Sequence, residues 1–183
     1  QEKVKNLVHS ATKTIASPNT VISSYDSLDI SDIYKLHAVF DSGDLGTEPI
    51  IPSLNLDSPS NDALTIGETI KGEISNATGI VVTSVGGASS LQYIPVTGSF
   101  VPEKITGQSS GFEKTVSLVV AGSTNVTSKY ELDNGQRDNF YDHGRIKLKS
   151  GQIAPVGKLE VVFDYFGHSG NGYLSVDSYT AAI

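Results

Sequence analysis

The sequence predicts an all-β fold, built of small antiparallel β-sandwich or barrel modules made of hairpins. Three observations lead to this prediction. Short β-branched and aromatic runs recur along the chain, glycines punctuate nearly every gap between them, and an internal repeat has the form strand, glycine turn, polar loop, strand. Beyond the first sixteen residues, the pattern is that of strands.

Composition and charge narrow the classes of function. The chain has 183 residues and a formal net charge of −7, and its charged fraction of 18% is low, so Ser, Thr, Asn and Gly must supply much of the polar surface. The negative charge argues against nucleic-acid binding and against docking on an anionic membrane, because both need a basic surface. No apolar run approaches the ~18 residues of a membrane-spanning helix.

Two residue types are absent from the sequence. Without cysteine, disulfides, zinc–thiolate sites and cysteine nucleophiles are excluded, and assembly in a reducing cytoplasm is slightly favoured. Without methionine, even at position 1, the chain is expected to be a piece of a longer protein, with loss of the initiator methionine as the milder alternative.

Residues 1–28 are expected to form an N-terminal arm or linker. Within residues 1–16 the apolar positions fit one face of a short helix, but Thr12 and Thr14 weaken that pattern. A short helix and an extended segment both remain open. Either form makes the arm a candidate contact with another protein chain.

Residues 29–122 are expected to form a β-domain. Residues 33–40 are β-branched and aromatic, as in a strand, and a turn signal follows them. Residues 44–62 contain three prolines, and we expect a long loop that carries function or marks a subdomain boundary. Further strands are expected at residues 65–71, 79–85, 91–96, 100–106 and 114–120.

Residues 123–183 are expected to form a C-terminal β-segment that can share a sheet system with the preceding domain. Residues 144–148 are one candidate strand. Residues 158–166 are the strongest candidate, because two sets of side chains alternate along them. One set is Leu159, Val161, Phe163 and Tyr165, and the other is Glu160, Val162, Asp164 and Phe166.

An internal repeat lies within the β-domain, at residues 64–87 and 99–122. Residue types recur at a shift of 35 positions, in more places than the roughly one or two that chance gives. Each copy has the pattern of a β-hairpin whose turns need residues tolerant of positive φ. Two such hairpins can close a small barrel or sandwich. The recurring residues are Glu68, Ile70, Gly72, Ser75, Val81, Val85 and Gly87, matched by Glu103, Ile105, Gly107, Ser110, Val116, Val120 and Gly122.

The densest polar cluster lies between residues 133 and 142. Carboxylates of Asp133, Asp138 and Asp142 could hold Ca²⁺, although their spacing does not match the EF-hand pattern. An ordered turn is the preferred interpretation, with Asn134-Gly135 as a tight reversal. Arg137 or Arg145 is then expected to pair with a nearby aspartate in bidentate fashion. We therefore predict a structural turn here and no metal or cofactor site.

No catalytic residue is assigned. The pairs Asp142-His143 and Asp164…His168 could belong to a Ser-His-Asp arrangement, but no Gly-x-Ser-x-Gly motif accompanies them. The glycine-rich segment 167–173 lacks the Lys-Ser/Thr of a phosphate-binding loop and is expected to be a hairpin loop. The prediction is a protein that is not an enzyme.

Two stretches of the sequence resemble a known family. Residues 64–82 resemble the Gly-Glu-x-Ile-x-Gly-x-x-Ser-x-Ala-Thr-Gly hairpin repeat of large tail and baseplate proteins of tailed bacteriophages, notably those of cyanobacteria. The second copy departs from this pattern, with Pro102 in place of the first Gly. Residues 130–145 are similar to a segment of the same proteins that precedes a long strand and a Ser-Val-Asp-Ser-Tyr ending, which is residues 175–179 here.

The resemblance implies a virion structural protein, part of a phage tail or baseplate, assembled in the host cytoplasm. Its expected partners are other phage structural proteins and further copies of itself, with neither nucleic acid nor membrane. The alternative is a receptor- or carbohydrate-binding β-sandwich at the tip of a tail fibre. Sugar rings would then stack on exposed aromatic side chains, with Tyr141, Tyr173 and Tyr179 as candidates.

Overall fold

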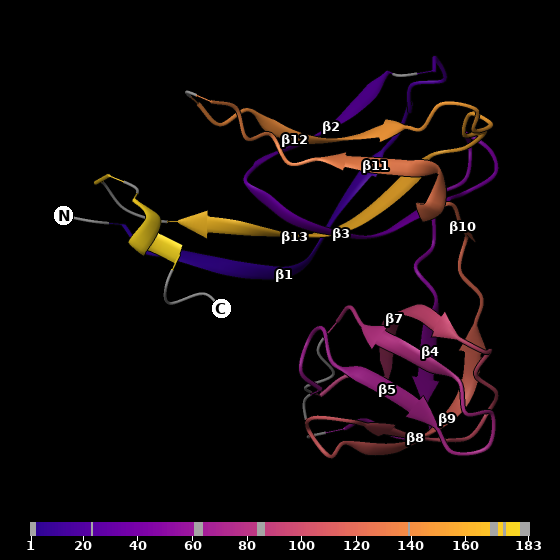
Figure 1. The fold of residues 1–183 in the computed structure, drawn as a ribbon. Helices are drawn as coiled ribbons and strands as arrows, with labels where there is room; N and C mark the ends of the chain where they lie inside the picture. The colour runs from indigo at the N-terminus through magenta and orange to yellow at the C-terminus, as the bar shows by residue number, and fades with distance from the viewer. Residues whose placement is uncertain are drawn as a thin grey trace.

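The computed structural model describes residues 3–22, 24–60, 64–83, 87–138, 140–168, 172–173 and 175–179. The all-β prediction is confirmed, because antiparallel strands form a two-sheet sandwich and a closed barrel (Figure 1). In this part of the chain, helical structure is confined to two short 3-10 segments, η1 (Thr127–Lys129) and η2 (Val176–Tyr179).

The sandwich combines the two ends of the described chain. Its four-stranded sheet has the order β1 (Lys5–Ile15), β13 (Leu159–His168), β3 (Ile33–Asp41), β10 (Thr124–Asn125). Its three-stranded sheet has the order β11 (Tyr130–Asp133), β12 (His143–Leu148), β2 (Tyr25–Ser31). The two sheets share one apolar core, in which Val161 and Phe163 of the first sheet meet Ile146 and Leu148 of the second.

The N-terminal segment differs from the separate arm expected from the sequence. Residues 5–15 form β1, which pairs with β13 from Lys5 opposite His168 to Ile15 opposite Leu159. The helical alternative is not found. The reason is the partner strand: Ala11 and Ile15 pack against the sandwich core, and the β-branched residues between them suit a pleated sheet.

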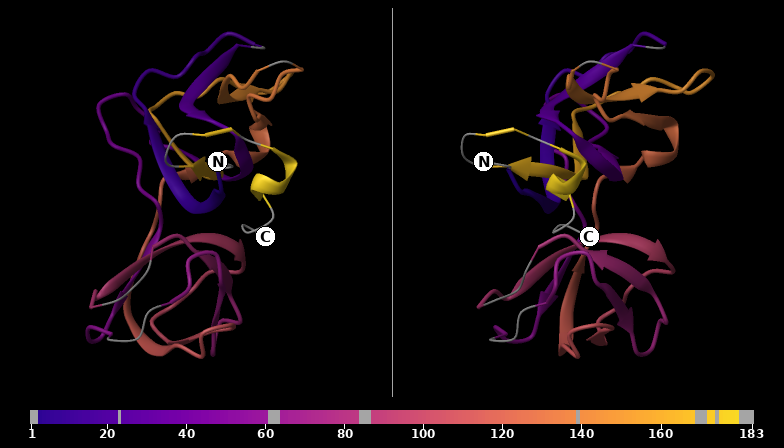
Figure 2. Two further views of the ribbon diagram at one scale, coloured as in Figure 1. Left: turned by 90° about the vertical axis from the view of Figure 1, so that its left-hand side faces the viewer. Right: turned by 60° about the vertical axis from the view of Figure 1, so that its left-hand side comes forward.

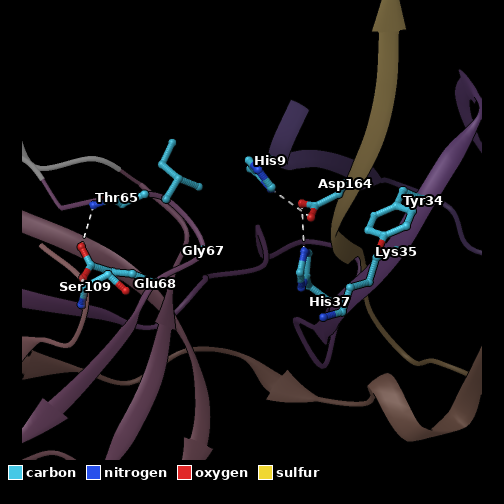
Figure 3. A pocket seen from close by; sticks show the side chains of 10 residues that line it. His9, Tyr34, Lys35, His37, Thr65, Gly67, Glu68, Ser109 and Asp164 are labelled. Carbon is cyan, nitrogen blue, oxygen red and sulfur yellow. Dashed lines mark hydrogen bonds and ion pairs between the residues drawn. The ribbon is translucent and has the colours of Figure 1, made fainter. Parts of the chain in front are cut away.

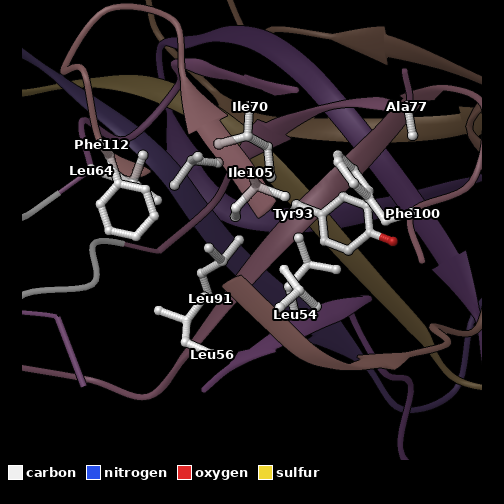
Figure 4. Packing of buried hydrophobic residues seen from close by; sticks show 12 residues of the cluster. Leu54, Leu56, Leu64, Ile70, Ala77, Leu91, Tyr93, Phe100, Ile105 and Phe112 are labelled. Atoms are coloured by element: carbon white, nitrogen blue, oxygen red, sulfur yellow. The ribbon is translucent and has the colours of Figure 1, made fainter. Parts of the chain in front are cut away.

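The barrel is inserted between β3 and β10. Around it the strands run β4 (Ser53–Leu56), β7 (Ser90–Thr97), β6 (Thr78–Val81), β5 (Thr69–Gly72), β8 (Lys104–Gly107), β9 (Glu113–Val120). Figure 4 shows its apolar core, which includes Ile70, Ile105 and Phe112. Strand β4 lies inside the proline-rich segment expected to be a loop. It forms there because Leu54 and Leu56 alternate with polar residues and point into the barrel core.

The two repeats occupy matching places in the barrel. Strands β5 and β8 pair antiparallel, with Ile70 opposite Gly107 and Gly72 opposite Ile105. Ile105 and Gly107 hold the same places in the second repeat as Ile70 and Gly72 hold in the first. Exchanging the two repeats therefore turns the pair Ile70–Gly107 into the pair Ile105–Gly72, and the reverse. The barrel therefore has an approximate two-fold axis between β5 and β8.

Two segments of the chain cross between the sandwich and the barrel (Figure 2), and an apolar seam also joins the two bodies. In the seam, Phe40 and Val162 of the sandwich pack with Val82 and Ile94 of the barrel. The crossing segments are bonded to each other, because Ser123 donates its backbone N–H to the Ile50 carbonyl at 2.8 Å and accepts the Ile50 N–H on Oγ at 2.9 Å. The two bodies therefore meet through a packed contact rather than through a linker alone.

Candidate functional site

The predicted turn at residues 133–145 is organised around one carboxylate. Arg137 donates from Nη1 and Nη2 to the two oxygens of Asp133 at 2.9 Å each, and Arg145 donates from Nε at 2.8 Å. These bonds, those of Arg137 first, hold the pKa of Asp133 well below its usual range. Gly135 has a φ of 82°, and a Cβ there would lie 2.1 Å from the Asp142 carbonyl oxygen, so the turn requires glycine.

The three aspartates named as a calcium candidate do not form one ligand set. Both oxygens of Asp133 are already bonded to guanidinium groups. Asp142 accepts the backbone N–H of His143 at 2.8 Å, and its other oxygen lies 4.0 Å from Arg137. Across the described residues, no group of three or more His, Asp or Glu side chains is placed to hold a metal ion.

Asp164 joins two histidines that lie far from it in the sequence. It accepts from Nε2 of His37 at 2.8 Å, from the backbone N–H of Ser10 at 2.8 Å, and bonds Nδ1 of His9 at 3.2 Å. Its side chain is 5% exposed, while that of His9 is 46% exposed. His168, which the sequence offered as a possible partner of Asp164 in a Ser-His-Asp arrangement, lies at the exposed end of β13. Residues 169–171 of the glycine-rich segment lie outside the described residues.

Irregularities in both neighbours of β13 produce this arrangement. In β3, Ala38 and Leu36 face Val162 and Phe163, so His37 is an extra residue. Tyr34 is a second extra residue of β3, between the partners of Asp164 and Tyr165. In β1, His9 and Ser10 together face Asp164, and Ser10 has a φ of 54°. Such β-bulges re-aim side chains and are common beside functional sites.

The bulged residues line a cleft between the sandwich and the barrel, which we call the junction cleft (Figure 3). Its volume is about 410 Å³. The sandwich wall carries His9, Tyr34, Lys35, His37 and Asp164, and the barrel wall carries Thr65, Ile66, Gly67, Glu68 and Ser109. Clefts of this size at the border between two domains are one of the preferred places for small-ligand sites.

Both carboxylates of the cleft are held in the ionised form. Burial raises the pKa of Asp164, but hydrogen bonds from His37, Ser10 and His9 outweigh it, so the pKa lies below its ordinary value. The pKa of Glu68 is lowered for the same reason, by donors from Ser110, Thr65 and Ser109 against the effect of burial. Neither carboxylate is tuned to act as a proton donor at neutral pH.

A second buried cluster ties the N-terminal strand to the C-terminal end. The ammonium of Lys5 contacts the carboxylate of Asp32 and donates to the Tyr179 hydroxyl at 2.8 Å. It also lies 4.7 Å and 4.5 Å from the ring centroids of Tyr141 and Tyr179. Two of the three tyrosines proposed for sugar stacking therefore contact this cluster, and Tyr141 is 49% exposed there. The third, Tyr173, is 62% exposed.

Sequence reasoning missed the junction cleft. An aspartate inside the apolar strand at residues 158–166 was the available signal, but periodicity does not reveal that its partner His9 lies 155 residues away. The bulges that bring the histidines to it arise from strand pairing, which single-sequence patterns do not contain.

Comparison with known proteins found no match: no family model, no curated protein and no solved structure corresponds to this chain. Within the described residues, no helix has the length and apolarity to cross a membrane.

Proposed function

We propose that this chain is a non-enzymatic structural component of a bacteriophage virion, a segment of a tail or baseplate protein that assembles with neighbouring subunits. The resemblance of residues 64–82 and 130–145 to phage tail and baseplate proteins supports the class. The partners we propose are other structural proteins of the particle and further copies of the same chain.

The observation that carries the proposal is that the buried carboxylates of Glu68 and Glu103 bond the backbone of turns. Glu103 accepts the backbone N–H groups of Ile74 and Ser75 at 2.6 and 2.9 Å, and Glu68 accepts those of Ser109 and Ser110 at 3.1 Å each. Carboxylates that act as acids commonly have raised pKa values. The pKa values of Glu68 and Glu103 are lowered, which suits groups that fix turns.

The long edge strand β1 offers a surface for assembly. Along β13, the backbone N–H and C=O groups of successive residues point alternately towards β3 and towards β1. The even-numbered residues bond on the β3 side, because the carbonyl of Lys158, just before β13, accepts from Ser42 and the N–H of Phe166 donates to Asp32. The odd-numbered residues therefore bond to β1. Thr12 and Thr14, which face even-numbered partners, turn their backbone groups outward. An outward-facing edge of this kind can pair with a strand of a neighbouring subunit.

The test is the location of the chain in purified particles. Tails are separated from heads by gradient centrifugation, and peptides of the chain are quantified by mass spectrometry, with the major head protein as internal control. The proposal predicts that the peptides accompany the tails at a fixed copy ratio set by tail symmetry. Peptides found in the infected-cell lysate but absent from the particles would contradict it.

A further inference from the structure

We propose that the junction cleft binds a neutral carbohydrate, with the ring of Tyr34 as the stacking surface. This function is additional to the structural role, and either can be wrong without the other.

The sandwich wall is built by three bulges, and each delivers a residue to the same cleft. Tyr34 and His37 are extra residues relative to β13, His9 belongs to the two-residue bulge with Ser10, and all three line the cleft. Each bulge interrupts the regular ladder of backbone hydrogen bonds, and the packing of the sheet does not by itself require such an interruption. Binding of a ligand in the cleft explains why all three bulges lie along it.

Tyr34 is an exposed aromatic residue that packs on a neighbouring ring. The residue is 58% exposed, and its ring forms an edge-to-face pair with Phe166, with a centroid distance of 5.4 Å and an interplanar angle of 65°. Phe166 is braced in turn by Tyr179 at 5.1 Å. Binding therefore requires little further ordering of the ring. The partial negative charge of an aromatic face attracts the C–H groups of a pyranose ring.

Polar groups suited to hydroxyls line both walls of the cleft. Asp164 occupies Nδ1 of His9, which leaves Nε2 of the half-exposed imidazole for a ligand. Lys35 adds an ammonium that has no ion-pair partner among the described residues. On the barrel wall, Thr65 and Ser109 add hydroxyl side chains. One aromatic face with a few polar groups is the usual make-up of a small-ligand site.

The charge of the cleft selects against anionic ligands. Asp164 and Glu68 stand on opposite walls, and both have lowered pKa values, so both are ionised at neutral pH. Hydrogen-bond donors satisfy Glu68, and the described part of the chain places no cation on it. An anionic sugar would face these two carboxylates against the single ammonium of Lys35, so the balance of these three charges is negative and favours a neutral sugar.

The test uses saturation-transfer NMR with the whole chain and defined probes: cellohexaose, maltohexaose and mannohexaose as neutral sugars, and hexagalacturonate as the anionic comparison. We expect saturable binding of at least one neutral probe and weaker binding of hexagalacturonate. Tyr34→Ala should weaken binding about tenfold, whereas Tyr34→Phe, which keeps the ring, should stay within about twofold. Tyr25→Ala is the matched control, because Tyr25 is 52% exposed on the other sheet.

The proposal is overturned if none of the neutral probes binds saturably, or if hexagalacturonate binds more tightly than all of them. It is also overturned if Tyr34→Ala binds as the unchanged protein does, or if Tyr25→Ala weakens binding equally. Since Tyr34 is mostly exposed, the thermal unfolding of Tyr34→Ala should match that of the control, which separates loss of the site from loss of the fold. Localisation to tails is measured separately, so failure here leaves the structural proposal unaffected.

Discussion

Glu68 and Glu103 each hold the tight turn that belongs to the other's repeat. Glu68 bonds the turn of the second copy through Ser109 and Ser110, and Glu103 bonds the turn of the first copy through Ile74 and Ser75. The exchange ties the two hairpins together at both ends of the β5–β8 pair. The two copies of the repeat, which are separate in the sequence, are thus held together in one closed barrel.

Replacement of either glutamate should destabilise the barrel by a similar amount. In Glu68→Gln and Glu103→Gln, an amide replaces a carboxylate that accepts several N–H groups, so charge-assisted bonds are lost. We expect each change to lower the free energy of unfolding by about 2 kcal/mol, measured by urea denaturation. Losses confined to one of the two variants would contradict the reciprocal arrangement.

The same glutamates predict how stability depends on pH. Because their pKa values are lower in the folded chain than in the unfolded chain, where Glu titrates at about 4.3, folding gains stability from them above that pH. That contribution should be lost as the pH falls from about 4 through the folded pKa values. The double variant Glu68→Gln/Glu103→Gln should show a shallower fall in the unfolding free energy over this range. An equally steep fall would assign the acid sensitivity to other groups.

Gly72 should not tolerate a side chain. A Cβ at this position would lie 2.4 Å from Oε1 of Glu103 and 2.6 Å from Oγ of Ser75. Gly72→Ala should therefore cost about 1–3 kcal/mol by overpacking the turn. Gly167→Ala is the control, because its nearest contact, to the Tyr165 ring, would be an ordinary 3.4 Å. Equal thermal stability of the two variants would show that the turn relaxes freely.

The hydroxyl of Tyr130 should reduce stability. It is buried in the sandwich core and has no hydrogen-bond partner among the described residues. Tyr130→Phe removes an unsatisfied polar atom while keeping the ring, so we expect a gain of about 1 kcal/mol in unfolding free energy. A loss of stability in chemical denaturation would mean that the hydroxyl has a bonded partner.

Replacing only one partner of the buried ion pair between Lys5 and Asp32 should strongly lower the free energy of unfolding. Lys5→Met leaves a buried, uncompensated carboxylate, and we expect a loss of about 3–5 kcal/mol. Adding Asp32→Asn should recover part of that loss, because asparagine removes the charge and tolerates the φ of 61° at this position. A double variant no more stable than Lys5→Met would show that the charge is not the cause.

The sequence predicted the strands with the clearest apolar patterns. The runs at 33–40 and 158–166 became β3 and β13, which lie in the centre of a sheet and are buried over residues 38–41 and 161–164. Strands β1 and β2 lie at sheet edges, where polar residues alternate with few apolar ones, so their patterns resemble an arm or a loop.

The site could be predicted less well than the fold. Arg137 and Arg145 lie close in sequence to the aspartate that they hold, and local spacing was enough to propose the pairing. The junction cleft is made by strand bulges and by an inserted barrel, and neither leaves a local pattern.

The most direct test of the structural role is the position of this chain in the intact phage particle, determined by cryo-electron microscopy at side-chain resolution. Our account predicts that the chain lies in the tail or baseplate with its sandwich, and β1 in particular, packed against neighbouring subunits. A chain at a free distal tip, with the sandwich in contact with no other subunit, would contradict it.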